Sequence, residues 1–223
     1  MTAFRIANSN FDPQPKRKPA KNKVRIRNEQ MNIDLVPLPP IDLLHQIFQL
    51  DPLIPHGLRW IERPRSHFRH ELGHKFFSAK WPGQAAGSFC KKYYRISLTY
   101  RAGDEWISVQ LHNHRIIWAL HNERDPGPNL IDHADIDGRN NHGGNLRLAD
   151  GIQNSQNRHR RADNRTGVAG VSFRTDIGKW RVRITVAKKV IDLGCFDTLE
   201  AAASVRKSAE IEYFGSFAPS EEA

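Results

Sequence analysis

The amino-acid sequence predicts an α+β protein in which short strands and short helices follow one another. Alternating or β-branched apolar residues over 93–100 and 105–111 indicate strands, whereas apolar residues at helical spacing over 41–50 indicate a helix. Apolar residues make up 39% of the 223 residues, which is enough for a globular protein that buries a core. A chain of this length has room for one medium domain or two small ones.

The first 35 residues are predicted to be a basic tail. The segment 16–27, KRKPAKNKVRIR, is dense in positive charge and has few apolar residues, a composition typical of chains that are disordered on their own. Two interpretations stay open for this tail, a basic arm that binds DNA phosphates and a solvated segment without a partner.

The next segment begins with a predicted helix and a predicted strand. We expect the helix over Ile41–Leu50, with Asp42 as its N-cap, because apolar side chains recur there at helical spacing. GLRWIERP is typical of a short strand that ends at Pro64. A hairpin follows, in which RAGD at 101–104 joins the two strands named above. The run 114–123 predicts a further helix.

The region 130–161 is predicted to fold as strand, loop, strand and helix. Asp132 and His133 end the first strand, Asn145 lies 12 residues beyond His133, and Asn154 lies 21 residues beyond it. Asp150 begins the helix, and the glutamine three residues later completes the pattern of a capping box. In this order, two strands and a helix can converge on one metal ion and one phosphate.

These residue types suit phosphodiester hydrolysis. The reaction needs a deprotonated water, a stabilised leaving oxygen and a phosphate held in place. An imidazole has a pKa near neutrality and can act as the base. Carboxylate and amide oxygens are hard ligands that Mg²⁺ prefers, and a bound cation offsets charge that builds on the leaving oxygen.

The same region resembles the HNH, or ββα-metal, nuclease family, in the form found in homing endonucleases of phages and introns. The segments HRIIWALH, LIDHADIDGRNN, NLRLAD and NSQNR match the family pattern in order and spacing. The resemblance implies that His133 is the general base and that Asn145 braces the loop that orients it. It also implies that Asp132 and Asn154 are ligands of a divalent metal ion, Mg²⁺ or alternatively Mn²⁺, with no organic cofactor.

The chain departs from the family pattern around this loop. Gly143 and Gly144 stand where the family usually has a branched apolar residue, and Ala134 is smaller than the usual residue. We expect these residues to weaken the packing of the loop. In the preceding helix, His114 and Trp118 are expected to pack in the core, with a catalytic role for His114 as the alternative.

The segment 166–219 is predicted to form three strands and a helix, with Thr198 as the N-cap. It resembles the apetala/ethylene-response-factor (AP-two/ERF) type of DNA-binding domain, which is fused to HNH nucleases in many phage-type proteins. The resemblance rests on GVAGVSFR, GKWRVRI, LGCFDTLEAA and YFGSFAP. It implies a three-stranded antiparallel sheet packed on one helix, with the sheet in the major groove of double-stranded DNA.

Arginines and one tryptophan are the candidate DNA-binding residues. Alternation along the strand places Trp180 on one face and Arg181 with Arg183 on the other, so the two arginines are the better candidates. The basic end of the helix after Asn154 is also expected to touch phosphates, and Asn157 is assigned to that end. The complete set of candidates is Arg158, Arg160, Arg161, Arg174, Trp180, Arg181 and Arg183.

A second motif, HELGH at 70–74, competes for a different function. On a helix, this spacing places His70 and His74 on one face as zinc ligands, with Glu71 as the base of a protease. The charged flanks, the helix-weakening Gly73 and the lack of a third ligand downstream count against this interpretation.

Charge and composition restrict the partner and the location. The net charge of +10 favours a polyanionic partner, for which nucleic acid is the commonest class. The two cysteines form no CxxC pair, and the sequence has neither a membrane span nor the apolar region of a signal peptide. We therefore expect a cytoplasmic protein without a membrane partner. A monomeric state is compatible with the sequence.

The predicted organisation is a basic tail at 1–35, an HNH endonuclease domain at 36–162 with its ββα-metal core at 130–161, and a DNA-binding domain at 166–219. The predicted activity is that of a homing or nicking DNA endonuclease. The alternatives are a catalytically inactive, sequence-specific DNA-binding protein and, as a third candidate, the zinc protease.

Overall fold

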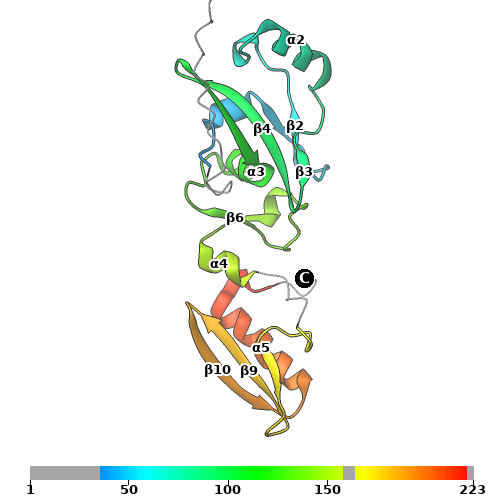
Figure 1. The fold of residues 1–223 in the computed structure, drawn as a ribbon, viewed down its shortest axis with the longest axis vertical. Helices are drawn as coiled ribbons and strands as arrows, with labels where there is room; N and C mark the ends of the chain where they lie inside the picture. Colours follow the sequence, from blue (N-terminus) through cyan, green and yellow to red (C-terminus); the bar gives the residue numbers. More distant parts are fainter. Residues whose placement is uncertain (1–35, 158–163, 220–223) are drawn as a thin grey trace, which may run out of the picture.

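The computed structural model describes residues 36–157 and 164–219. Within these residues the protein is an α+β structure with small antiparallel sheets, as predicted (Figure 1). Two parts follow one another along the long axis, residues 36–157 at one end and 164–219 at the other. The basic segment 16–27 and three predicted DNA contacts lie outside the described residues, namely Arg158, Arg160 and Arg161.

The first part consists of short helices and strands around one central hairpin. In chain order these elements are α1 (Ile41–His45), β1 (Phe48–Leu50), β2 (Leu58–Trp60), η2 (Arg65–His67), α2 (Glu71–Lys80), β3 (Ser88–Cys90), β4 (Tyr93–Ala102), β5 (Glu105–His112), α3 (Asn113–Asn122), β6 (Leu130–His133), η3 (Gly143–Asn145), β7 (Leu146–Ala149) and α4 (Gly151–Gln156).

The first helix is shorter than the sequence predicts. α1 ends at His45, and β1 then pairs antiparallel with β2, so the second half of the predicted helix is wrong. The predicted N-cap is wrong as well, because Pro40 occupies that position and Asp42 lies in the first turn. Tertiary packing explains the difference. Phe48 lies opposite Trp60 in the strand ladder with their ring centroids 4.8 Å apart, and such packing overrides a weak helical propensity.

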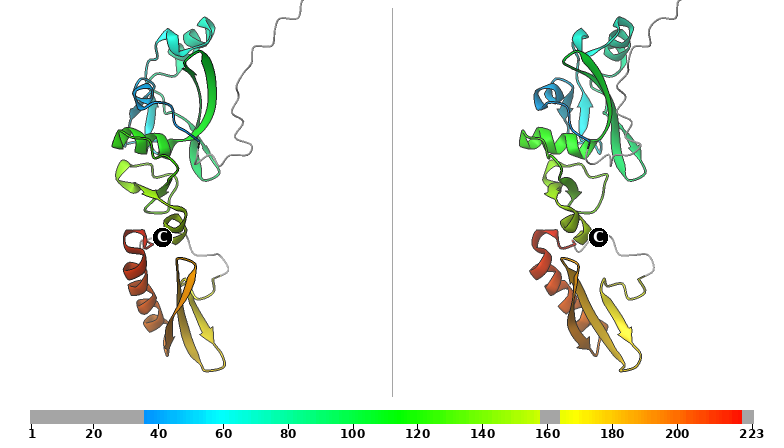
Figure 2. Two further views of the ribbon diagram at one scale, coloured as in Figure 1. Left: turned by 90° about the vertical axis from the view of Figure 1, so that its left-hand side faces the viewer. Right: turned by 60° about the vertical axis from the view of Figure 1, so that its left-hand side comes forward.

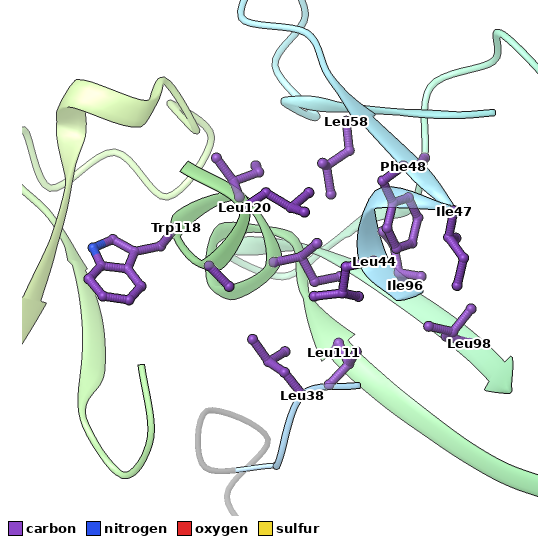
Figure 3. Close-up of a cluster of buried hydrophobic side chains, with 14 of the residues drawn as sticks. Leu38, Leu44, Ile47, Phe48, Leu58, Ile96, Leu98, Leu111, Trp118 and Leu120 are labelled. Atoms are coloured by element: carbon purple, nitrogen blue, oxygen red, sulfur yellow. The ribbon is translucent and has the colours of Figure 1, made fainter. Parts of the chain in front are cut away.

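The core of the first part lies between the sheet β3–β4–β5 and helices α1 and α3. Figure 3 shows its apolar side chains, among them Leu44 from α1, Ile96 from β4 and Leu111 from β5. Trp118 is buried in this core, and His114 is 2% exposed, so both α3 side chains pack inside as predicted. This core supports the surface on which the next three elements lie.

Strands β6 and β7 and helix α4 form a ββα unit next to α3 (Figure 1). The strands are antiparallel, with Asp132 opposite Arg147 and His133 opposite Leu146. Asp150 accepts hydrogen bonds from the backbone N–H groups of the first turn of α4, and the Gln153 side chain accepts one from the Asp150 N–H. The predicted capping box is therefore confirmed, and it determines where the helix starts.

The second part is a three-stranded antiparallel sheet covered on one face by a helix (Figure 2). Its elements are β8 (Val171–Arg174), β9 (Lys179–Val186), β10 (Lys189–Phe196), α5 (Leu199–Phe214) and η4 (Gly215–Phe217), with the strand order β10–β9–β8. Val182 and Ile184 of β9 face α5 and are buried, in two small apolar clusters separate from the core of the first part. The Thr198 hydroxyl caps α5 as predicted.

Among the described residues, no helix combines the length and the apolar character that crossing a bilayer would require.

Candidate functional site

Asp132 lies at the centre of the ββα unit and is buried, at 6% exposure. Its Oδ2 accepts two hydrogen bonds from Arg147, from Nε at 2.9 Å and from Nη2 at 2.8 Å. The same oxygen accepts a third from Asn157 Nδ2 at 2.9 Å. Because Arg147 is the cross-strand neighbour of Asp132, the strand register itself brings this ion pair together. Within the described residues, all three of these hydrogen bonds end on Oδ2 rather than on Oδ1.

His133 follows Asp132 and is also buried, with its ring between aromatic and imidazole neighbours. It lies nearly parallel to Tyr93, with the ring centroids 5.7 Å apart, and the ring of His114 meets it edge-on at 5.1 Å. Burial lowers the pKa of His133 below the usual 6.5, and the hydrogen bond with Asn141 opposes this shift. The imidazole is therefore neutral at pH 7.

The contact with Asn141 determines which nitrogen of His133 is free. Asn141 Nδ2 donates to the backbone carbonyl of Pro55, so Asn141 Oδ1 is the acceptor that faces His133 Nε2 at 3.1 Å. The neutral ring must then carry its proton on Nε2. The lone pair lies on Nδ1, which is the nitrogen able to accept a proton from water.

Asn145 holds the loop that connects the two strands. Its Nδ2 donates to Asp135 Oδ1 at 2.9 Å and to the carbonyl of Asn140 at 2.8 Å, and its Oδ1 accepts from the Asp135 N–H at 3.1 Å. The backbone carbonyl of Asn145 also accepts from the N–H of Ala134. One side chain therefore ties both ends of the loop together directly after His133.

Asn154 and Asn157 come from α4, which packs on both strands. Asn154 lines a pocket together with Asp132 and His133. The sequence assigned Asn157 to the basic end of the helix, in contact with the phosphate backbone rather than with metal, but the structure buries this side chain. It is 4% exposed, and Nδ2 bonds to Asp132 and to the carbonyl of His133 at 2.7 Å. The assignment of Asn157 to phosphate contact is therefore wrong, because its position at the end of α4 turns it inward.

The pocket between these residues has a volume of about 270 Å³. It is lined by Lys92, Tyr93, Ile131, Asp132, His133, Ile136, Asn154 and Asn157. Lys92 and Tyr93 were not found by sequence reasoning, since the β3–β4 turn and the start of β4, which carry them, lie some 40 residues before the motif. The only available signal was the basic pair before a strand, which occurs on many surfaces.

Glycines let the loop approach its neighbours closely. A Cβ atom on Gly138 would lie 2.5 Å from the carbonyl oxygen of Lys92, and one on Gly143 would lie 2.4 Å from the ring of His121. At Gly144 the nearest atom is at 3.5 Å, in the ring of His142. A residue with a Cβ atom at Gly143 would therefore require the exposed ring of His121 to move.

The oxygens around the pocket fit a hard divalent cation. Asp132, Asn154 and Asn157 line it, and their side chains carry carboxylate and amide oxygens, the ligand types that suit Mg²⁺. No group of three His, Cys, Asp or Glu side chains that could hold a metal occurs in residues 36–157 and 164–219. A site there would depend on amide oxygens and water, as expected for Mg²⁺, and would suit zinc poorly.

Arg147 connects this pocket to the second part of the protein. Its guanidinium donates to the backbone carbonyl of Ser216 and lies over the ring of Phe217, 4.2 Å from the centroid. Both residues belong to η4, directly after α5. The same side chain therefore positions the Asp132 carboxylate and contacts the C-terminal part.

The predicted DNA-binding residues of β8 and β9 divide between the two faces of their sheet. Arg181 bonds to Asp192, with Nε 2.9 Å from Oδ2, and Arg183 is exposed on the same face, away from α5. Arg174 of β8 is held by Asp176. Trp180 packs with the apolar cluster beneath α5, as its alternation with Val182 indicates.

The HELGH motif does not adopt the geometry that a zinc protease needs. His70 is the N-cap of α2 with extended backbone, so it lies outside the helix that would align it with His74. The Glu71 carboxylate bonds to Arg65 Nε at 2.6 Å, and the ring of His74 packs against Phe68.

Comparison with family models, with curated proteins and with solved structures finds no match to this chain.

Proposed function

We propose that this protein is a metal-dependent DNA endonuclease of the HNH type that nicks double-stranded DNA. The observation that carries the proposal is the convergence of Asp132, His133 and Asn154 on one pocket, while Asn145 holds the loop between the strands. An acid and a neutral imidazole from β6 meet an amide from α4 there, which polar loop hydrogen bonding alone would not require.

In this proposal His133 is the general base. Its Nε2 is occupied by Asn141, so Nδ1 takes the proton from the attacking water. The neutral state that burial maintains is the state that accepts a proton. The side chains of His114 and Tyr93 restrict the ring to one orientation.

The cation and the phosphate are held by separate groups. Asp132 and Asn154 would hold Mg²⁺, which would offset the negative charge that builds on the leaving oxygen. The ammonium of Lys92 lines the same pocket and provides a positive charge for the phosphate of the scissile strand. A single pocket acts on one phosphodiester bond at a time, which favours nicking.

The substrate class follows from the charge and from the exposed sheet face. A net charge of +10 favours a polyanion, and Arg181 and Arg183 lie side by side on the face of β9 that no helix covers. We propose that this face binds double-stranded DNA and that the ββα unit cleaves it.

Plasmid nicking tests the activity directly. We expect the purified protein to convert supercoiled plasmid to the open-circular form with Mg²⁺ or Mn²⁺ and to leave it supercoiled in EDTA, as read on an agarose gel. Equal conversion in both buffers would contradict metal dependence. No conversion, combined with retained DNA binding, would favour the alternative of a non-catalytic DNA-binding protein.

The sheet face is tested by the double substitution Arg181→Ala and Arg183→Ala. Each arginine that contacts a phosphate contributes about one unit to the slope of log affinity against log salt, so we expect this slope to fall by about two. Affinity for a plasmid fragment, measured by fluorescence anisotropy, is expected to fall at least tenfold at low salt. The control is Lys207→Ala, which removes a charge from the exposed side of α5. Equal losses in both variants would rule out a specific role for the sheet face.

A further inference from the structure

Asn157 has an orientation that its neighbours determine. Its Nδ2 lies 2.9 Å from Asp132 Oδ2 and 2.7 Å from the carbonyl oxygen of His133. Both neighbours only accept hydrogen bonds, so the amide nitrogen must face them and Oδ1 must point the other way. The reversed orientation would bring an amide oxygen against a carboxylate oxygen.

The Oδ1 atom of Asn157 is buried and has no hydrogen-bond partner among residues 36–157 and 164–219. Buried side-chain oxygens in native proteins nearly always have one, so an unpaired oxygen needs an explanation. Asn157 lines the pocket that also contains Asp132 and Asn154. The residue that carries this unused lone pair therefore lines the pocket where the proposed cation would be held.

We propose that Asn157 Oδ1 is the third protein oxygen of the divalent-cation site, beside Asp132 and Asn154. The assignment rests on the proposed function in that the cation is the one the nuclease would use. In this role one side chain has two tasks, since Nδ2 holds the Asp132 carboxylate in place and Oδ1 faces the cation. A carboxylate oxygen and two amide oxygens form a weak, hard-ligand site that suits Mg²⁺ and Mn²⁺.

Mn²⁺ binding without DNA tests the proposal independently of catalysis. We expect Asn157→Ala to weaken Mn²⁺ binding to the full-length protein about 10- to 100-fold, as measured by isothermal titration calorimetry. The rise in the unfolding midpoint on adding Mn²⁺, relative to EDTA, should shrink accordingly. The matched control is Gln156→Ala, the neighbouring residue that does not line the pocket. A purely structural Asn157 would lower the midpoint in EDTA and leave the Mn²⁺ affinity unchanged, which would overturn the proposal.

Asn157→Asp gives a second test that does not depend on the alanine variant folding. It keeps an oxygen at the position of Oδ1 but places a second carboxylate against Asp132, a repulsion that a bound divalent cation relieves. We expect a lower midpoint in EDTA and a larger Mn²⁺-induced rise than in the wild type. A rise no larger than that of the wild type would contradict the proposal.

The two proposals fail in different measurements. If Mn²⁺ binding depends on Asn157 but plasmid is never nicked, the cation site stands and the nuclease assignment fails. If plasmid is nicked with Mg²⁺ and Asn157→Ala binds Mn²⁺ like the wild type, the nuclease assignment stands and the role of Asn157 fails.

Discussion

Replacing His133 with alanine is expected to lower the rate of Mg²⁺-dependent nicking about 10²- to 10⁴-fold, the range that a positioned general base contributes. Asn141 occupies Nε2 and leaves Nδ1 as the free base, so the ring is arranged to take one proton from water. DNA affinity in EDTA should stay unchanged, because His133 is buried and only 4% exposed. Single-turnover nicking and fluorescence anisotropy measure the two quantities separately.

A matched histidine variant shows whether the effect is specific. His121 lies exposed at the end of α3, outside the pocket, so His121→Ala should nick plasmid at the wild-type rate. Nicking by His133→Ala at the wild-type rate would contradict the proposed mechanism.

The pH dependence should follow the lowered pKa of His133. Burial holds the imidazole neutral at pH 7. As far as His133 determines it, the nicking rate should therefore stay constant above pH 7 and fall only as the pH drops below about 6.5. The free energy of unfolding should also fall on acidification. The unfolded chain takes up protons at His133 and His114 before the folded protein does. The unfolding midpoint should therefore fall on acidification through the same window, and His133→Ala should reduce that fall.

Replacing Asp132 with asparagine is expected to abolish both Mn²⁺ binding and metal-dependent nicking. The substitution keeps the shape of the side chain but removes the one negative charge among the proposed ligands. The substitution also removes the negative charge that pairs with Arg147. The charge-assisted hydrogen bonds from Arg147 are then lost, which costs about 1.5–3 kcal/mol of stability. Calorimetry with Mn²⁺, plasmid nicking and chemical denaturation measure the three effects.

Asp137→Asn is the control for this variant. Asp137 is exposed in the same loop and does not line the pocket, so its substitution should leave Mn²⁺ binding and nicking within twofold of the wild type. An Asp132→Asn protein that binds Mn²⁺ as tightly as the wild type would exclude Asp132 as a ligand.

Local patterns in the sequence predicted most of the ββα unit correctly. The capping box at Asp150 depends on residues within one helical turn, and the short spacing from His133 to Asn145 spans a single loop. The alternation on β9 likewise needs only one strand to divide Trp180 from Arg181. These features follow from the neighbouring chain alone, which is why they can be read from the sequence.

Contacts between distant segments were decided only by the tertiary structure. The second half of the predicted first helix became β1, because Phe48 packs against Trp60 across a strand ladder. Lys92 comes to the pocket from the β3–β4 turn, which a close approach at Gly138 permits. No spacing rule covers such segments, since their meeting depends on how the separate elements pack.

The same contrast holds for the proposed metal site. The sequence by itself determined Asp132, His133 and Asn154 as candidate residues, because their types and spacing suit hydrolysis and resemble a known pattern. It assigned Asn157 to the basic end of the helix, in contact with phosphates, whereas the fold buries this side chain against Asp132. Burial is a property of how α4 packs on β6 and β7. Only the packed structure decided that Asn157 lines the pocket and that its amide nitrogen faces Asp132.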